Sequence, residues 1–260
     1  MKLRILPVLV VAIIFLAGVS TASRGLTLRY EGSPAIGKFI ELSNQVYGKC
    51  SFMTNVKTKS RGGEESISKG ASDIGGVANE LKPSLQEQGI TGTLIGKDEV
   101  AVIVNENNPV TELSLAQLKD IFSGKITTWK EVGGPDLAIE VLITSPISAT
   151  HDLFKRVVMN GDEYKARVME PEPTILLTAS RNKGAIGFVS QFVLNGKPQG
   201  VQLVKPNGEQ PSIANPNYPL SRPLYLLTKN HPPDEVKAFI DWTLSNEGQN
   251  LLKTVFHGVE

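Results

Sequence analysis

The stretch Lys97-Asp98-Glu99-Val100-Ala101-Val102-Ile103-Val104-Asn105 decides the fold class of this chain. Its centre, Val100 to Val104, is an unbroken apolar run rich in β-branched residues, which is typical of a strand buried on both faces. A helical pattern follows from Leu113 to Phe122, and Ser114 and Gln117 in it have the spacing of a capping box. A buried strand followed by an amphipathic helix indicates an α/β fold with a mostly parallel sheet.

The alternation of strand and helix signals extends from this stretch to both ends of the chain. It predicts strands at 26–30, 139–143, 185–189 and 224–227, and helices at 36–47, 153–158 and from about 232 to 244. Two polar, turn-rich segments, 105–109 and 215–219, interrupt the pattern. We expect the chain to cross between two lobes at these segments. The alternative is that both are ordinary loops within one domain.

The N-terminal segment has the three parts of an export signal. A basic start, Met1 to Arg4, is followed by an apolar run, Ile5 to Val19, and by the small residues Ser20-Thr21-Ala22. We therefore expect a signal peptide at 1–22; the alternative, an uncleaved anchor, is less favoured because a membrane span needs about 20 apolar residues. Val19 stands where a lipoprotein signal has its cysteine, so we do not expect a lipoprotein.

Composition excludes several classes of partner. Loss of Lys2 and Arg4 with the signal lowers the formal charge of the 260-residue chain from +1 to −1. Charges of both signs are mixed along the chain, so no field would hold it on nucleic acid. No stretch beyond the signal is apolar enough for stable membrane insertion. One cysteine and three histidines offer no zinc cluster, and no cofactor is implied. We expect a monomer in which the lone Cys50 is buried.

Three places combine a strand, a turn of small or hydroxyl residues, and a helix start. They are Gly32-Ser33-Pro34-Ala35, Ser60-Arg61-Gly62-Gly63 before a helix at 64–69, and Ser148-Ala149-Thr150 before a helix at 151–158. Each offers a hydroxyl and free backbone N–H groups at the positive end of a helix dipole, where anions bind. A serine at one helix start is usually only a cap. Three such sites would form an oxyanion pocket if the fold brings them together.

Several stretches, in order along the chain, resemble those of the phosphate-binding periplasmic proteins of ABC transporters. They are Ser60 to Gly63 with Asp73-Ile74-Gly75 and Ala78 to Lys82, Lys97 to Asn105 with Asn108-Pro109, Leu115 to Ile126 with Trp129 to Gly134, Lys183 to Val189, Tyr218 to Tyr225, and Phe239 to Trp242 with Gly248-Gln249. The resemblance implies a type II periplasmic-binding-protein fold, with two α/β lobes joined by a hinge of two crossing strands and a ligand cleft between them. Together with the two polar segments, it implies lobe I at 23–104 plus 222–260 and lobe II at 105–221.

The resemblance also implies which residues hold an oxyanion: Ser33, Ala35, Ser60, Arg61, Ala78, Asn79, Ser148, Ala149 and Thr150. This chain departs from the family at Pro34, where the family has Thr, at Ala78, where it has Asp or Ser, and at Thr144, where it has Arg. A hydrogen bond to a charged group is worth about 1.5–3 kcal/mol, so these losses weaken phosphate binding. Arg61 could replace the missing arginine and His151 could add charge. Alternatively, both side chains point to solvent.

The function that the resemblance implies is a periplasmic solute-binding protein that captures an oxyanion, phosphate first, for an ABC transporter. Its partners would be the small inorganic oxyanion and an ABC permease. The alternative is a binding module with a drifted anion site, acting as a sensor or regulatory protein for a different ligand. An enzyme is not expected, because the chain has no Gly-x-Ser-x-Gly sequence. The adjacent residues Thr150, His151 and Asp152 point apart on a helix and cannot form a proton relay.

Overall fold

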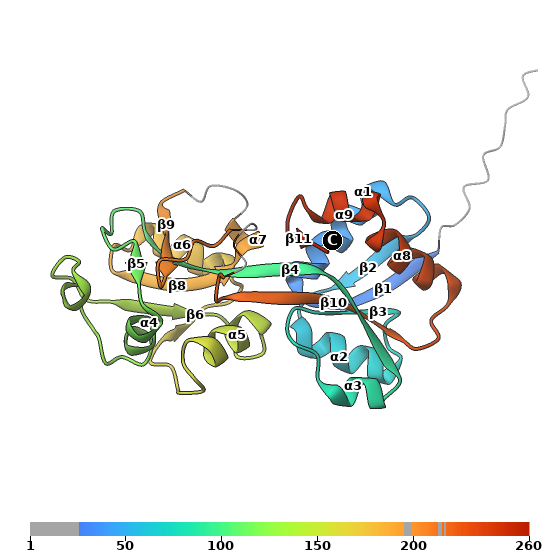
Figure 1. The fold of residues 1–260 in the computed structure, drawn as a ribbon, viewed down its shortest axis with the longest axis horizontal. Coiled ribbons are helices and arrows are strands. Elements are labelled where there is room, and N and C mark those ends of the chain that lie inside the picture. The colour runs from blue at the N-terminus through green and yellow to red at the C-terminus, as the bar shows by residue number, and fades with distance from the viewer. Residues whose placement is uncertain (1–25, 195–198, 213–214, 216, 260) are drawn as a thin grey trace, which may run out of the picture.

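The computed structural model describes residues 26–194, 199–212, 215 and 217–259, which form two α/β lobes joined by two long strands (Figure 1). The signal peptide expected at 1–22 lies outside the described residues. Among the described residues, no helix has the length and apolar character needed to cross a membrane.

The first lobe is built around a parallel sheet in the order β2-β1-β3, to which the crossing strands add antiparallel neighbours. Its core includes an aromatic cluster in which the ring centroids of Phe52 and Phe239 lie 4.5 Å apart. The elements of this lobe are β1 (Thr27–Gly32), α1 (Pro34–Val46), β2 (Ser51–Asn55), α2 (Lys59–Lys69), β3 (Ile74–Val77), α3 (Pro83–Glu87), α8 (Asp234–Leu244), α9 (Asn246–Leu252) and β11 (His257–Gly258).

The second lobe has its own core, in which the rings of Phe154 and Phe188 stack with centroids 4.0 Å apart. Ser114 and Gln117 form the expected capping box, so this part of the sequence prediction is confirmed. The elements are β5 (Glu112–Leu113), α4 (Leu115–Phe122), the 3₁₀ helix η1 (Trp129–Val132), β6 (Glu140–Ile143), α5 (Ala149–Val157), β7 (Arg167–Val168), α6 (Pro173–Arg181), β8 (Ala185–Ser190), α7 (Gln191–Leu194) and β9 (Val201–Pro206).

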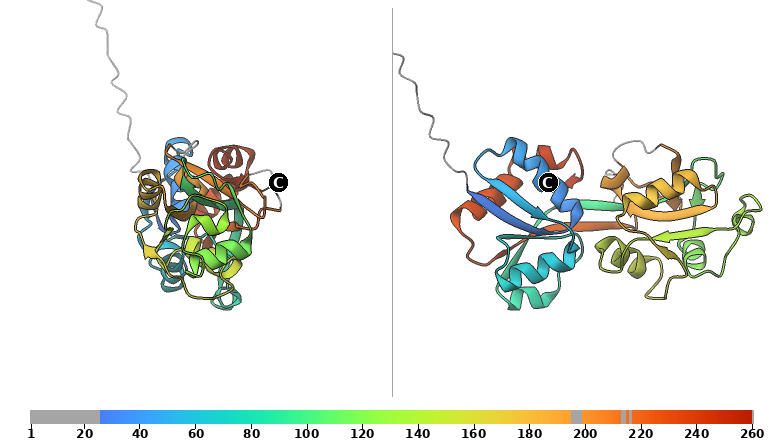
Figure 2. Two further views of the ribbon diagram at one scale, coloured as in Figure 1. Left: turned by 90° about the vertical axis from the view of Figure 1, so that its left-hand side faces the viewer. Right: turned by 180° about the vertical axis from the view of Figure 1, so that it is seen from behind.

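Two antiparallel strands, β4 (Ile90–Asn105) and β10 (Ser221–Lys229), run between the lobes (Figures 1 and 2). In the second lobe, β8 and β9 pair antiparallel with β4, whereas β6 pairs parallel with β8 and β7. The sheet is therefore mixed around the crossing strands and parallel only farther out. This differs from the mostly parallel sheet that the sequence predicted.

The chain passes from one lobe to the other within β4 and within β10. Ile95 and Leu224 pack in the core of the first lobe, whereas Val100 and Leu220 already pack in that of the second. The predicted crossing at 105–109 is instead a turn of the second lobe, where the Asn105 side chain donates hydrogen bonds to α6 carbonyls at 2.9 and 3.0 Å. A continuous hydrogen-bonded strand carries no turn signal, which is why the sequence pattern pointed to the nearest polar loops. We propose lobe boundaries near residues 96–100 and 220–224.

Candidate functional site

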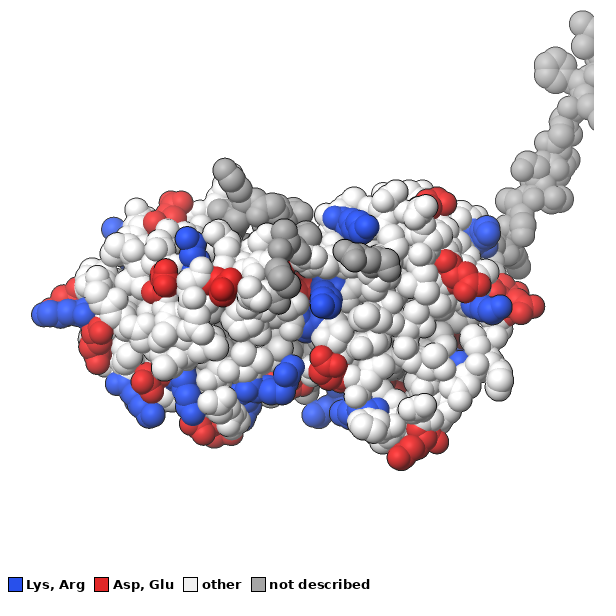
Figure 3. All heavy atoms as spheres, in the orientation of Figure 1, with Lys and Arg blue, Asp and Glu red and all other residues white. Residues whose placement is uncertain are grey.

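A cavity of about 420 Å³ lies between the two lobes, beside the crossing strands. Figure 3 shows Lys and Arg side chains in the notch between the lobes, while charges of both signs are scattered over the rest of this face. The residues that line the cavity are Ser33, Pro34, Ala35, Val56, Lys57, Lys59, Ser60, Thr144, Ser148, Ala149, Thr150, Glu170, Pro171, Glu172, Pro173, Phe192 and Arg222.

The N-terminus of α5 opens into this cavity. Ser148 is the N-cap, and its hydroxyl oxygen accepts a hydrogen bond from the backbone N–H of Thr150 at 3.2 Å. Ser148, Ala149 and Thr150 are all buried. The first backbone N–H groups of a helix have no partner within the helix and carry partial positive charge. This end of α5 is therefore suited to an anion.

The N-terminus of α1 lies on the other side of the cavity. Pro34 occupies the first turn of the helix, and the N-cap Ser33 makes no side-chain capping bond. Its backbone is fixed instead, because its N–H donates to the Gly76 carbonyl at 2.9 Å and its own carbonyl accepts from the Tyr30 hydroxyl at 2.7 Å. The Ser33 hydroxyl and the Ala35 N–H are thus held at the cavity wall while the Pro34 ring covers part of it.

Helix α2 starts earlier than the sequence predicted, at Lys59 rather than at Glu64. Gly62 and Gly63 therefore lie inside the helix, where a Cβ on Gly63 would come within 2.6 Å of a carbonyl of β3. Gly63 allows α2 to pack closely on the sheet, whereas Gly62 makes room for the Thr58 side chain, and neither glycine is part of the cavity wall. Ser60 does line the cavity, and its hydroxyl oxygen accepts from the backbone N–H of Ala78 at 3.2 Å.

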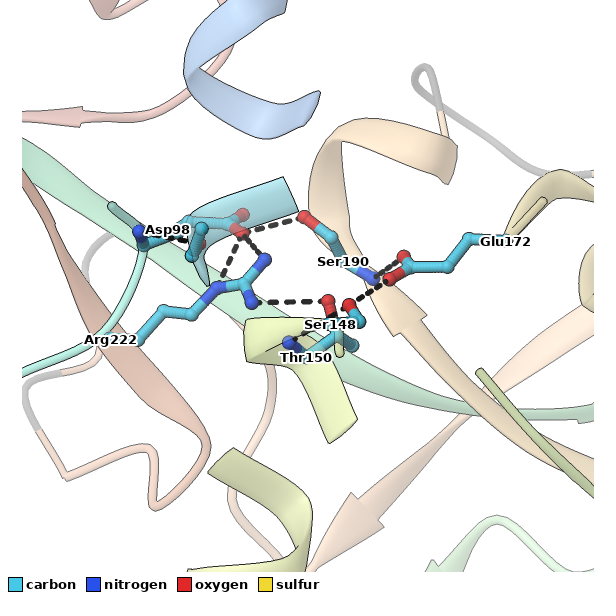
Figure 4. A network of polar contacts seen from close by, with 8 residues as sticks. Asp98, Ser148, Thr150, Glu172, Ser190 and Arg222 are labelled. Atoms are coloured by element: carbon cyan, nitrogen blue, oxygen red, sulfur yellow. Dashed lines mark hydrogen bonds and ion pairs between the residues drawn. The ribbon is translucent and has the colours of Figure 1, made fainter. Parts of the chain in front are cut away.

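A buried ion pair, of which Arg222 lines the cavity, joins the two crossing strands (Figure 4). Arg222 on β10 donates from Nε at 3.0 Å and from one terminal nitrogen at 2.6 Å to the same carboxylate oxygen of Asp98 on β4. Its other terminal nitrogen donates to the Thr150 hydroxyl at 3.0 Å, and Ser190 donates to Asp98 at 2.6 Å. Because the Thr150 oxygen accepts from Arg222, its own hydrogen remains available to a ligand. The pair thus connects both crossing strands to the α5 terminus.

A second group of ionisable residues lies behind this pair at the junction of the lobes. The Glu99 side chain, 3% exposed, lies 3.1 Å from Nε2 of His257. Burial, together with the neighbouring charge of Asp98, raises the pKa of Glu99 to about 7, and burial lowers the pKa of His257. Both shifts favour the neutral forms, as expected when ionisable groups leave water.

The second lobe contributes two carboxylates to the cavity wall. Glu170 pairs with Lys59 of the first lobe, so this ion pair spans the cleft. Glu172, which precedes α6, accepts from the Ser148 hydroxyl at 3.2 Å and from the backbone N–H of Ser190 at 3.0 Å. Figure 4 shows this carboxylate beside the hydroxyls of the α5 terminus.

The structure brings most of the predicted site residues together but not all. Six of them line the cavity: Ser33, Ala35, Ser60, Ser148, Ala149 and Thr150. Arg61 does not, because it lies one position along α2 from Ser60 and faces a separate surface hollow with Glu31 and Lys69. Ala78 reaches the site only through its backbone N–H. Asn79 bonds locally to the N–H of Glu80.

His151 is also outside the cavity wall. Its ring packs against Tyr164, with centroids 4.9 Å apart, and it is buried rather than at the surface. Cys50, which we expected to be buried, is half-buried, and burial raises the pKa of its thiol. Within the part of the chain that the structure describes, no group of three or more His, Cys, Asp or Glu side chains is placed to hold a metal ion.

Sequence reasoning missed Arg222, Lys59 and Glu172 as cavity residues. A usable signal existed for one of them. Asp98 and Arg222 each stand next to an apolar strand segment, and a charge buried in a strand is almost always paired. The positions of Lys59 and Glu172 depend on how the lobes meet, which a local pattern does not encode.

Known proteins show clear similarity to this chain. The family model of the PBP superfamily domain matches residues 20–247. A Staphylococcus epidermidis protein named phosphate-binding protein PstS is 29% identical over 242 residues, covering 84% of this chain and 74% of the relative.

Solved structures agree with this match. One, from Clostridium perfringens and described as a phosphate ABC transporter substrate-binding protein with bound phosphate, is 30% identical with a TM-score of 0.81. It covers 90% of this chain and 100% of that structure. A phosphate transport receptor from Vibrio cholerae, 24% identical, has the same fold with a TM-score of 0.76, over 90% of this chain and 100% of that one. Because the family model matches most of the chain and the Clostridium structure covers 90% of it, this chain belongs to the PBP superfamily.

Proposed function

We propose that this protein is an exported solute-binding protein that captures an oxyanion, phosphate first, in the cleft and delivers it to an ABC transporter. One observation carries the proposal: several groups converge on one cavity. They are the N-termini of α1 and α5, the hydroxyls of Ser60 and Thr150, and the Arg222 guanidinium. Helix N-termini, hydroxyls and guanidinium groups are the donors that bind oxyanions. The named relatives, which are phosphate-binding proteins, support the same ligand.

The arginine available for an anion differs from the one expected. Arg61 lies outside the cavity, whereas Arg222 lines it with its charge compensated by Asp98. A guanidinium has five N–H donors, and three of those of Arg222 are used by Asp98 and Thr150. The remaining donors can reach a ligand, but the compensated charge attracts an anion less strongly than a free arginine would.

We extend the proposal to the role and the location of the protein in the cell. The named relatives are binding proteins of transporters rather than enzymes, and we infer that this chain likewise binds its ligand without converting it. We place it in the periplasm, after removal of the signal at 1–22, as a monomer that docks on an ABC permease. The two-strand connection between the lobes suits closure of the lobes over the ligand.

Calorimetric titration with phosphate, arsenate and sulfate tests the proposal. The wild-type protein is expected to bind phosphate. Thr150→Val, which keeps the side-chain shape but removes the hydroxyl, is expected to weaken binding by about 10- to 150-fold, because one hydrogen bond to a charged ligand is worth about 1.5–3 kcal/mol.

Arg61→Ala is the matched control and is expected to bind phosphate as the wild type does. Absence of binding to all three anions would contradict the oxyanion proposal. If Arg61→Ala loses phosphate binding and Thr150→Val retains it, the site lies in the hollow beside Arg61 and not in the cleft.

A further inference from the structure

The cavity is larger than inorganic phosphate requires. Its volume is about 420 Å³. A water molecule takes about 30 Å³ of liquid, so a five-atom phosphate ion takes roughly 60–90 Å³ on that scale. Cavities of about 300–1,000 Å³ are typical of sites for small organic molecules. In this arrangement of the lobes, inorganic phosphate at the α5 terminus would leave most of this space to water.

One part of the cavity wall is apolar. Pro34, Ala35 and Val56 contribute to it from the first lobe, and Pro171, Pro173 and Phe192 from the second. The Phe192 ring is oriented by Phe256 of the first lobe, with centroids 6.4 Å apart. An apolar wall offers no hydrogen bonds to an oxyanion, whereas it stabilises the apolar carbon groups of a ligand when they are transferred out of water. The wall is therefore suited to an organic substituent on the anion.

The Glu172 carboxylate lies beside the α5 terminus, between Pro171 and Pro173 of the apolar wall in the sequence. Its hydrogen-bond partners are neutral, namely the Ser148 hydroxyl and the Ser190 N–H. Glu170, by contrast, is paired with Lys59. Among the described residues Glu172 has no ion-pair partner, so its negative charge remains available to a cationic group. The Ser148 hydroxyl has one hydrogen, and because it donates this hydrogen to Glu172, it cannot donate it to a bound anion.

A second polar group in the wall also lacks a partner. Thr144, whose side chain is fully buried and lines the cavity, has a hydroxyl without any hydrogen-bond partner among the described residues. Buried hydroxyls are nearly always bonded, so this one is expected to bond to a ligand or to water held with it.

The charges around the cavity are balanced, and Lys57 and Glu172 are the two that have no ion-pair partner among the described residues, since Lys59 pairs with Glu170 across the cleft. Lys57 and Lys59 come from the first lobe, and Arg222 from the crossing strand, where it is paired with Asp98. Glu170 and Glu172 come from the second lobe. A divalent anion alone leaves Glu172 without a counter-charge. A molecule with an anionic and a cationic end compensates both.

We propose that the cleft has a second subsite, formed by the apolar wall and Glu172, for an organic substituent that ends in an ammonium group. The ligand class is then an aminoalkyl ester of phosphate, with its phosphate at the α5 terminus and its ammonium at Glu172. This inference rests on the proposed oxyanion function and specifies its substrate class.

Calorimetric titration with three probes tests the inference: inorganic phosphate, ethyl phosphate and 2-aminoethyl phosphate. Ethyl phosphate is expected to bind at least as tightly as inorganic phosphate, and 2-aminoethyl phosphate at least about tenfold more tightly than ethyl phosphate. Glu172→Gln is expected to reduce that tenfold ratio to near one and to strengthen inorganic phosphate binding several-fold, because a negative charge is removed. Glu163→Gln, whose side chain is 88% exposed and pairs with Lys155, is the matched control and keeps the wild-type ratio.

The possible failures can be told apart. Tighter binding of inorganic phosphate than of both esters overturns the second subsite and leaves the oxyanion function standing. A ratio that Glu172→Gln does not change overturns the role of Glu172. Absence of binding to all three probes overturns the oxyanion function and this inference with it. The wild-type series decides the substrate class even if the Glu172→Gln protein does not fold.

Discussion

The junction between the lobes and the rim of the cleft both contain ion pairs, but they differ in burial. At the junction, the side chains of Arg222 and Asp98 are 3% and 0% exposed. At the rim, Lys59 is mostly covered, whereas 51% of the Glu170 side chain is exposed. Removal of one partner of a buried pair leaves an uncompensated charge in a poorly solvated place, whereas water replaces the partner of an exposed charge. The junction pair therefore matters for stability, and the rim pair is free to rearrange with the ligand.

The largest effect is expected from Arg222→Met. This change leaves the Asp98 charge buried with only the Ser190 hydroxyl as a partner, and we expect the free energy of unfolding to fall by about 3–5 kcal/mol. Urea denaturation measures it. The double variant Asp98→Leu with Arg222→Met is expected to recover most of that loss, since no buried charge remains. Equal loss in the single and double variants would show that packing, and not the charge, holds the junction.

A smaller effect, dependent on pH, is expected from Glu99. Its pKa is about 7 in the folded protein and near 4.5 when unfolded, so the folded state holds the proton more tightly. The contribution of Glu99 to stability is therefore full below pH 4.5, falls as the pH rises to about 7, and is constant above that. The total fall is roughly 3 kcal/mol.

Glu99→Gln removes this fall, so the stability of the variant relative to wild type should increase between pH 5 and pH 8. Thermal melts across that range measure the difference, with His257→Gln in both proteins because the His257 ring contacts Glu99. Glu163→Gln, a surface carboxylate, should show no such trend. A flat difference between Glu99→Gln and wild type would mean that Glu99 ionises normally at the junction.

The smallest effect on stability is expected at the rim. Lys59→Met breaks the pair with Glu170, and because that carboxylate is half exposed, we expect a loss of no more than about 1 kcal/mol in urea denaturation. The same variant should change the scattering profile toward a more open arrangement of the lobes, because the pair spans the cleft. A loss as large as that of Arg222→Met would remove the distinction between junction and rim.

The two regions also differ in how far the sequence predicted them. The capping box of Ser114 and Gln117 was predicted because all of its contacts are local. The helix predicted at 36–47 was found for the same reason, although α1 begins two residues earlier, at Pro34. The pairing of Asp98 with Arg222 joins residues far apart in the chain, and it becomes visible only when the register of β4 and β10 is known. The sequence therefore indicated which loops are suited to anions without indicating which cation joins them.

Arg61 was expected in the anion site, but the arginine that lines the cavity is Arg222. Ser60 and Arg61 were expected in a turn before a helix at 64–69, but α2 begins at Lys59, so both are helical and they line different hollows. Glu172 shows the opposite case. Nothing around it in the sequence indicates a cleft, and its place follows from the hydrogen bond that it accepts from Ser148 at the start of α5.

A crystal structure of the protein with phosphate tests whether an oxyanion binds at the α5 terminus inside the cleft. A phosphate ion is expected within hydrogen-bonding distance of the Ala149 backbone N–H and the Thr150 hydroxyl, with Arg222 still paired to Asp98. A phosphate ion in the separate hollow beside Arg61, or an unoccupied cleft at a phosphate concentration that saturates the calorimetric titration, would contradict this expectation.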